Sequence, residues 1–282
     1  MKSLVITADD FGASIEVNAA VEMAHLEGVL TAASLMVAAP GALDAVRRAK
    51  AMPTLGVGLH VVLVEGRPAL PASQVPALVD ASGHFRTDMV AAGINLFFNP
   101  IARRQLEAEI TAQFEAFART GLPLDHVNAH KHFHLHPTIA GLILKIGKRF
   151  GMRSARLPIE PRAVLAKIEP GGDYPPQPLV DFWANLARSR FRRAGLLVPD
   201  HVFGLGWSGA VTANRLSGLI RHLPEGLSEI YLHPAVSGYP GSAPGYRYAE
   251  ELGALLSRGA IEAARAPDIR RGRFADFVGG AV

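Results

Sequence analysis

Histidine recurs at every second position in one short stretch of this chain, between residues 125 and 137. The stretch carries five of the eleven histidines, with Asn128 in step with them: His126, His130, His132, His134 and His136. In an extended backbone these side chains would share one face. Neighbours on such a face lie roughly 6.5–7 Å apart, whereas a metal ligand lies about 2 Å from its ion. A straight strand can therefore give one ion a single histidine, or two if the chain bends, and the other ligands must come from elsewhere.

Two adjacent carboxylates follow the first apolar run of the chain. Residues 4–8 predict a buried strand, and Asp9 and Asp10 come directly after it. Carboxylates in that position are costly unless they are used. Gly12 lets the chain turn, so that both side chains can reach one cavity at the end of the strand.

Predicted strands and helices alternate along the chain. The expected strands are 4–8, 30–37, 56–62, the histidine stretch, 154–157, 201–205, 229–232 and 274–278. The expected helices are 14–27, one ending near 51, 101–120, 138–150, a basic helix after 178 and one at 212–222. This alternation is typical of a parallel sheet or barrel with its helices outside. We expect one α/β domain with a (β/α) barrel fold.

The polar residues with chemical potential share one position relative to these strands. Asp9, Asp10, His60, His130 and His233 each come at or near the C-terminal end of a predicted strand. In (β/α) barrels that face carries the active site. We therefore expect these side chains to lie close together.

The residue types narrow the chemistry without settling it. One carboxylate and two histidines with open positions suit catalytic Zn²⁺, and they equally suit a non-haem Fe(II) oxygenase. Mg²⁺ ranks lower because it prefers oxygen ligands. A second aspartate beside the ligand favours hydrolysis, since an activated water needs a base. The chain lacks a phosphate-binding glycine loop and a Gly-x-Ser-x-Gly motif.

Composition excludes several other classes of protein. The chain of 282 residues has no cysteine, which excludes disulfides, thiolate metal sites and a cysteine nucleophile. We find no signal-peptide pattern and no apolar run of about 18 residues, and we expect a cytoplasmic protein. Arginine clusters at 188–193 and 265–273 indicate solvated helix faces or peripheral contact with an anionic membrane. Aromatic residues do not interleave with them, so we expect no nucleic-acid partner.

Two long stretches rich in proline and glycine interrupt the regular pattern, at 65–100 and 160–178. A loop as long as the first is normally functional or a lid. It contains Phe97 and Phe98, which could contact an apolar substrate. Arg156 comes near the end of the predicted strand 154–157 and is, with His132, a further candidate for substrate binding.

Four motifs in order resemble the YdjC-like carbohydrate deacetylases. They are Thr7-Ala8-Asp9-Asp10-Phe11-Gly12, Gly58-Leu59-His60, the histidine stretch and Leu232-His233-Pro234. The resemblance implies a distorted (β/α) barrel that removes acetyl groups from N-acetylated sugars, including chitooligosaccharides. It implies that Asp10, His60 and His130 hold a divalent metal, with Zn²⁺ first and Mg²⁺ or another ion as alternatives. Asp9 would be the base, and His233 would stand near the leaving group, with His132 as the alternative proton donor.

One motif departs from the chitooligosaccharide branch of that family. Asn128-Ala129-His130-Lys131 stands where that branch tends to carry Asp-Ser-His-His. With the Phe-Phe loop and the long insertions, this looks more like the hopanoid-biosynthesis branch, which deacetylates an N-acetylglucosaminyl lipid. The expected partner is thus an N-acetylated glycolipid or an N-acetylated oligosaccharide. With a glycolipid as substrate, we expect the protein to work at the inner face of the membrane. A dimer of the protein is compatible with both substrates. An Fe(II) oxygenase and a non-catalytic sugar- or lipid-binding barrel stay open as alternatives.

Overall fold

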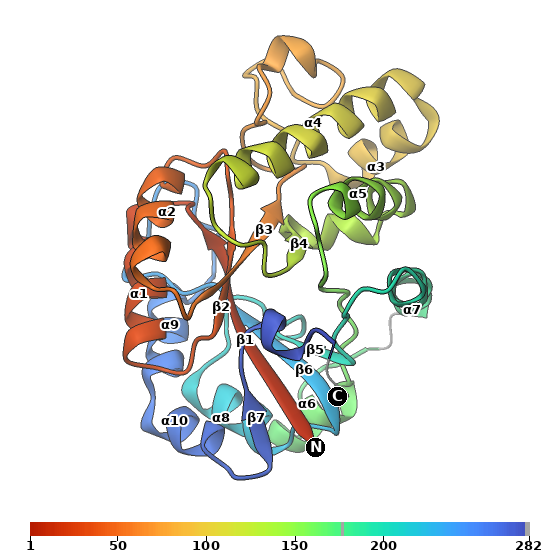
Figure 1. Ribbon diagram of the computed structural model, residues 1–282. Coiled ribbons are helices and arrows are strands. Elements are labelled where there is room, and N and C mark those ends of the chain that lie inside the picture. The colour runs from red at the N-terminus through yellow and green to blue at the C-terminus, as the bar shows by residue number, and fades with distance from the viewer. Residues whose placement is uncertain (176–177, 280–282) are drawn as a thin grey trace.

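The computed structural model describes residues 1–175 and 178–279 and has an α/β fold (Figure 1). Its centre is a curled sheet with the strand order β4-β3-β2-β1-β6-β5, and β7 also pairs with β1. The strands are β1 (Lys2–Phe11), β2 (Ala32–Leu35), β3 (Gly56–Val61), β4 (Val127–Ala129), β5 (His201–Phe203), β6 (Gly226–Leu232) and β7 (Ile269–Arg271). All pairings between these strands are parallel. With helices packed around it, the sheet forms the distorted (β/α) barrel expected from the sequence.

The helices follow the strands in the alternation that the sequence predicted. They are α1 (Ile15–Leu26), α2 (Ala42–Ala51), α3 (Met89–Phe98), α4 (Pro100–Arg119), α5 (Pro137–Arg149), α6 (Arg162–Ile168), α7 (Pro178–Arg193), α8 (Ala213–Arg221), α9 (Tyr248–Leu256) and α10 (Arg258–Ala264). In Figure 1, α1 and α2 lie beside the strands on one side of the molecule, and α4 and α5 lie beyond β3 and β4.

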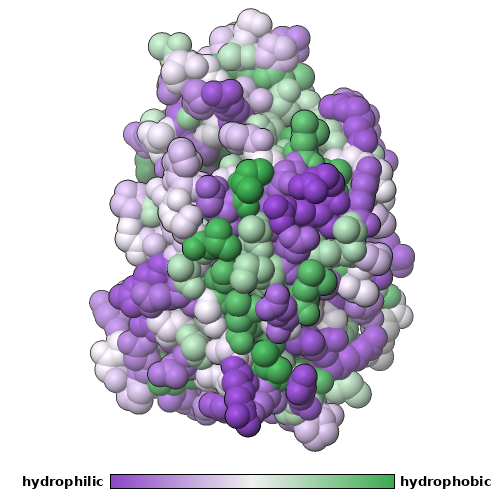
Figure 2. Space-filling view, turned by 90° about the vertical axis from the view of Figure 1, so that its left-hand side faces the viewer, coloured by the Kyte–Doolittle hydropathy of each residue, from purple (hydrophilic) through white to green (hydrophobic). Residues whose placement is uncertain are grey.

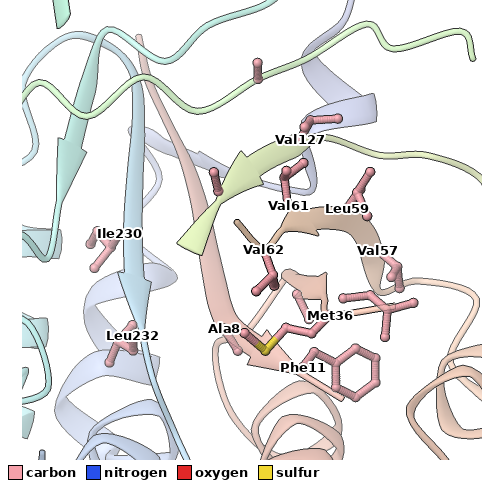
Figure 3. Packing of buried hydrophobic residues seen from close by; sticks show 14 of the residues in the cluster. Ala8, Phe11, Met36, Val57, Leu59, Val61, Val62, Val127, Ile230 and Leu232 are labelled. Carbon is pink, nitrogen blue, oxygen red and sulfur yellow. The ribbon is translucent and has the colours of Figure 1, made fainter. Parts of the chain in front are cut away.

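Strand β1 lies in the middle of the sheet, and both of its faces are buried. Every residue after Lys2 in this strand is buried, as is typical of a parallel strand covered on both sides. It pairs with β2 on one edge and with β6 on the other. Ala8, Leu59 and Leu232 belong to the apolar cluster around it (Figure 3). This packing fixes the end of the strand, where the two aspartates stand.

The histidine stretch is not the extended strand that its alternation predicted. Strand β4 ends at Ala129, and a 3-10 helix (His130–Leu135) follows it. Lys131 and His132 have left-handed backbone conformations, with φ of 51° and 53°, which carry the chain out of the sheet. Pro137 then begins α5. The histidines consequently no longer share one face.

Both stretches expected to be irregular contain helices. Residues 65–100 include a short 3-10 helix (Ala72–Gln74) and α3, whose first N–H groups are capped by the Asp88 side chain. Residues 160–178 include α6; residues 176 and 177 of that stretch lie outside the described residues. Phe97 and Phe98 therefore belong to a helix and not to a loop.

Two predicted strands are also replaced. Residues 154–157 make isolated bridges and no regular strand. The chain end forms a 3-10 helix (Phe274–Phe277) instead of a closing strand. The Asp125 carboxylate accepts hydrogen bonds from the backbone N–H groups of Phe274 and Ala275, which holds this segment in a turn.

The outer helical layer carries an apolar band. Figure 2 shows hydrophobic side chains running down the face that includes α1 and α2, where Ile15, Met23, Leu26 and Leu43 are exposed. None of these four lines the two large cavities at the strand ends. Across residues 1–175 and 178–279, no helix is both long and apolar enough to cross a membrane.

Candidate metal centre

Three side chains from three strand ends meet at one edge of the sheet. Asp10 lies near the end of β1, His60 near the end of β3, and His130 directly after β4. Asp10 Oδ1 is 3.1 Å from His130 Nδ1 and 3.2 Å from His60 Nε2, and the two ring nitrogens are 3.3 Å apart. In the part of the chain that the structure describes, this is the one cluster of such ligands close enough to share an ion.

The dimensions and donor types of this triangle fit a divalent cation. Ligands about 2.0–2.2 Å from Zn²⁺ lie about 3–3.5 Å from one another, and all three edges fall in that range. Burial alone would raise the pKa of Asp10, but His130 and His60 hold that pKa well below its ordinary value. The ligand oxygen is therefore charged. Two imidazoles and one carboxylate suit zinc or iron better than Mg²⁺.

Backbone geometry and a buried amide orient the ligands. Asp10 has a φ of 61°, which is uncommon for a residue with a side chain and turns its carboxylate toward the two histidines. The oxygen of Asn128 can only accept a hydrogen bond, so His60 Nδ1 donates to Asn128 Oδ1 at 2.7 Å. His60 Nε2 is then the nitrogen with a free lone pair. An outer hydrogen bond of this kind fixes the tautomer of a metal-binding histidine.

Asp9 stands next to the triangle and is held by four hydrogen bonds. Arg156 donates to both of its oxygens, at 2.5 and 3.0 Å. Ser34 Oγ and Asn128 Nδ2 donate to Asp9 Oδ1 at 2.8 and 3.0 Å. Burial alone would raise the pKa of Asp9, but Arg156 and the nearby histidines hold that pKa well below its usual range. Asp9 is thus a fixed carboxylate, linked to His60 through Asn128.

Arg156 lies behind Asp9, away from the cavity. Its side chain is completely buried, and its guanidinium also donates to Glu229 Oε1 at 2.7 Å. It lies over the ring of Tyr231, 4.4 Å from the centroid. A guanidinium without exposed surface does not reach the cavity, so the structure does not place Arg156 where the predicted substrate contact would need it. Glu229, which also accepts from Thr7 Oγ1, balances its charge together with Asp9.

Two imidazoles line the same cavity as Asp9. His132 Nε2 lies 2.9 Å from the hydroxyl oxygen of Tyr231. His233 packs against the rings of Tyr231 and Tyr246, and its Nδ1 is 4.0 Å from the carboxylate of Glu251. For both histidines, Nδ1 is buried and has no hydrogen-bond partner among the described residues. Each is a candidate for proton transfer at the cavity wall.

The other histidines of the stretch serve the fold. His126 is fully buried and stacks on a phenylalanine ring. His134 Nε2 donates to the backbone carbonyl of Arg156 at 2.9 Å, and His136 Nε2 donates to that of Gly93 at 3.2 Å. Only His130 and His132 of the five line the cavity.

The cavity in front of Asp9 has a volume of about 810 Å³, which is ample for a whole small molecule. Its wall combines aromatic rings, carboxylates and hydroxyl groups, among them Tyr174, Tyr231, Tyr239, Tyr246, Tyr248, Glu160, Asp173, Asp181, Ser208 and Ser242. Such a wall suits a ligand with many hydroxyl groups. Phe97 and Phe98 are exposed on α3 and do not line it, so the structure does not bring these two predicted residues to the site.

Comparison with known proteins identifies the family. The family model described as "YdjC-like protein" matches residues 3–266 of this chain. The chain belongs to the YdjC-like family. A relative from Geobacillus stearothermophilus named "Carbohydrate deacetylase" is 32% identical over 257 residues, covering 89% of this chain and 88% of the relative. A human protein of the same name is 32% identical and covers 86% of this chain and 76% of its own length.

A third relative matches over a shorter part. The "Carbohydrate deacetylase" of Brevibacillus brevis is 41% identical over 147 residues. That alignment spans 52% of this YdjC-like chain and 56% of the relative, so about half of each chain is compared.

Solved structures agree with the fold of this YdjC-like chain. A protein from Enterococcus faecalis V583, whose name refers to cellobiose-phosphate cleavage, superposes with a TM-score of 0.77. It is 23% identical, and the match covers 98% of this chain and 99% of that one. A lactam utilization protein from Thermus thermophilus superposes with a TM-score of 0.51 at 16% identity, and the match covers 97% of this chain and 100% of that one. At these identities the likeness concerns the fold alone.

Sequence reasoning missed the residues that support Asp9 and His60 in this YdjC-like site. Ser34, Asn128 and Glu229 hold them by hydrogen bonds, either directly or through Arg156. Glu229 had a detectable signal, because it is the only charged residue in the predicted strand 229–232. Ser34 carries no comparable signal, since a small uncharged side chain in a buried strand can serve packing alone.

Proposed function

We propose that this protein is a divalent-metal-dependent hydrolase that removes the acetyl group from an N-acetylated sugar. The observation that carries the proposal is the triangle of Asp10, His60 and His130 with the fixed carboxylate of Asp9 beside it. The names of the relatives add the substrate class: three of them are called carbohydrate deacetylase. The aromatic and hydroxyl-rich wall of the cavity supports the same substrate class.

Asp10, His60 and His130 would hold the ion, and zinc fits their donor set best. When bound, such an ion supplies Lewis-acid activation of water and of a carbonyl oxygen. A carboxylate and two neutral imidazoles carry one negative charge in total, so the ion would keep a net positive charge for that purpose.

Asp9 would take the proton from the water that adds to the acetyl carbon. Its two oxygens are fixed by Arg156, Ser34 and Asn128, so that it is charged and oriented before the substrate arrives. A positioned base of this kind contributes about 10²–10⁴-fold to a rate. Arg156 would act only through Asp9.

His233 would deliver a proton to the sugar nitrogen when the carbon–nitrogen bond breaks. An amide nitrogen leaves poorly as an anion and needs that proton. His233 lines the same cavity as Asp9, and its buried Nδ1 lies 4.0 Å from the Glu251 carboxylate, so Nε2 is the nitrogen that would face the substrate. His132 occupies a similar place, but its Nε2 is already engaged with the Tyr231 hydroxyl.

For the substrate, we further propose an N-acetylglucosaminyl group carried by a polycyclic lipid of the hopanoid type. Helix α3 supports a substrate held in a membrane, because Val90, Ile94, Phe97 and Phe98 lie outside the cavity and leave 51–76% of their surface exposed. Such a patch would meet a lipid or a membrane surface. A chitooligosaccharide is the alternative acceptor, and it has no use for this patch.

Acetate release tests the proposal. The purified protein is treated with a chelator, dialysed and reloaded with Zn²⁺, and acetate is measured with an N-acetylglucosaminyl lipid and with a chitooligosaccharide. We expect release that stops after chelation, returns with Zn²⁺ and is faster with the lipid. Faster release from the oligosaccharide would reject the lipid acceptor. Oxygen consumption without acetate would identify an oxygenase, and binding without turnover would identify a non-catalytic barrel.

A further inference from the structure

A second chamber opens from the metal centre beside the main cavity. Its volume is about 480 Å³. Asp10 and His130 line both spaces, and so do Glu65, Tyr239 and Gly241. The two ligand residues therefore lie at the boundary between the chambers. A substrate whose reacting atom sits at the triangle can extend into both.

The two chambers differ in their walls. Small apolar groups form about half of the second chamber's wall, from Ala13, Met36, Val37, Ala38, Ala39, Pro40, Val62 and Pro240, and polar side chains that include Glu65 and Gln113 form much of the rest. Figure 3 shows Met36 and Val62 near the ends of β2 and β3, where they form part of this wall. Arg67 and His84, joined by a hydrogen bond of 3.2 Å, also line it. The chamber thus offers a contiguous run of small apolar residues, 36–40, beside polar groups.

The proton-transfer groups determine which end of the substrate enters which chamber. Asp9, His132 and His233 line the larger cavity and do not line the second chamber. The nitrogen that leaves must lie beside a proton donor, so the sugar occupies the larger cavity. In an amide, the acyl substituent points away from the nitrogen substituent across the carbonyl carbon. The acyl group therefore points toward the second chamber.

That chamber is far larger than an acetyl group requires. A methyl group is about the size of a water molecule, whose share of liquid volume is about 30 Å³. A space of about 480 Å³ falls instead in the range of whole small-molecule sites, about 300–1,000 Å³. The small apolar residues at 36–40 give one side of that space the chemistry that an alkyl chain needs.

We propose that the second chamber is an acyl-chain site, and that the enzyme also hydrolyses N-acyl sugars with longer linear acyl chains, such as butanoyl and hexanoyl. The inference rests on the proposed hydrolysis of an N-acyl sugar. In the reaction, water adds to the acyl carbonyl carbon and the carbon–nitrogen bond breaks. The products are a fatty carboxylate and the amino sugar, whose nitrogen receives the proton.

Ala38 offers the cleanest variant for blocking the chamber. It lines the chamber and is half-buried, and it does not belong to the apolar groups packed on the core. Ala38→Phe fills the space from its wall, and Ala38→Ser is the size-matched control. Ala243→Phe is the control for the larger cavity, because Ala243 lines only that one.

The experiment measures kcat/KM of the zinc-loaded enzyme for N-acetyl-, N-butanoyl- and N-hexanoylglucosamine. For the wild type and Ala38→Ser, we expect the hexanoyl value to stay within tenfold of the acetyl value. Ala38→Phe should lose at least thirtyfold on the hexanoyl substrate and less than threefold on the acetyl one. Ala243→Phe should lower all three alike. Acetyl hydrolysis with a loss above a hundredfold at butanoyl overturns the acyl-chain site and leaves the proposed function standing.

A binding measurement decides the case if no amide is cleaved. Acetate, butanoate and hexanoate are titrated into the zinc-loaded protein by calorimetry. Burying a methylene group contributes about 0.8 kcal/mol, or about fourfold in affinity, so affinity should rise along the series. Ala38→Phe should remove that rise. Equal affinities in the wild type reject the chamber as an acyl site, whatever the enzyme's activity.

Discussion

Asp9 and Arg156 form a two-pronged ion pair in which the arginine side chain is wholly buried. The pair joins β1 to the segment after α5, and Glu229 on β6 completes it. Because the positive charge is fixed behind the carboxylate, Asp9 keeps its negative charge and its orientation without help from the substrate. The residue next to it, Asp10, is left to face the two histidines.

Replacing Asp9 by asparagine should show whether Asp9 acts as the base or as a metal ligand. The amide keeps the shape of the side chain and removes the basic oxygen, so kcat should fall by about 10²–10⁴-fold. The zinc content of the purified variant, measured by elemental analysis, should stay at the wild-type level. If zinc is lost from this variant and retained in Asp10→Asn, the roles of the two aspartates are reversed.

Removing His130 should cost metal, whereas removing another histidine of the same stretch should not. His130→Ala takes away one of three ligands, and we expect its zinc affinity to fall at least a hundredfold. His136→Ala is the matched control, because His136 binds the carbonyl of Gly93 and not the triangle. A competition titration with a zinc indicator measures both. Equal affinities for the two variants would exclude His130 as a ligand.

Asn128→Ala should weaken zinc binding without touching a ligand. Asn128 accepts a hydrogen bond from His60 Nδ1 and also donates one to Asp9. Loss of such an outer partner typically costs 10–100-fold in metal affinity. We expect that loss, together with a lower kcat, in the indicator titration and the acetate assay. Unchanged zinc affinity would show that His60 does not need the amide to present Nε2.

His134 should make the folded protein sensitive to mild acid. Burial, and then Arg156, lower the pKa of His134 from 6.5 to about 3. The unfolded chain therefore binds a proton near pH 6.5 while the folded chain does not, so stability falls as the pH drops from about 6.5 toward 3. The loss of folding free energy due to His134 amounts to about 1.4 kcal/mol per pH unit between these two values, and there is no such loss above about pH 6.5.

The comparison is made with His134→Gln, which can still donate to the carbonyl of Arg156 but does not titrate. Urea unfolding of both chelated proteins between pH 4 and 7 should give a shallower slope for the variant. Parallel slopes would mean that His134 is protonated in the folded state.

The sequence predicted the position of the metal centre better than its surroundings. Asp10, His60 and His130 could be placed together because parallel strands deliver their C-terminal ends to one edge. The shape of the histidine stretch could not be foreseen, since its two-residue period does not reveal the left-handed conformations of Lys131 and His132. The sequence also could not show that Arg156 is buried, because its partners lie on β1 and β6.

Helix α3 was not predicted from the sequence, because the proline and glycine residues around it indicated an irregular loop. Its signals were present, because Asp88 caps its first turn and Asn99 caps α4 at Pro100. These capping residues predict two helices meeting at Asn99, but they do not predict that Phe97 and Phe98 are exposed on α3.

The most direct test of the account is the location of the ion itself. Crystals of the zinc-loaded protein are measured on both sides of the zinc absorption edge, and the anomalous difference map locates the metal. We predict one peak about 2.0–2.2 Å from Asp10 Oδ1, His60 Nε2 and His130 Nδ1, with Asp9 and Arg156 still paired behind it. A peak bound by other residues, or none at this triangle in a zinc-loaded crystal, would contradict the account.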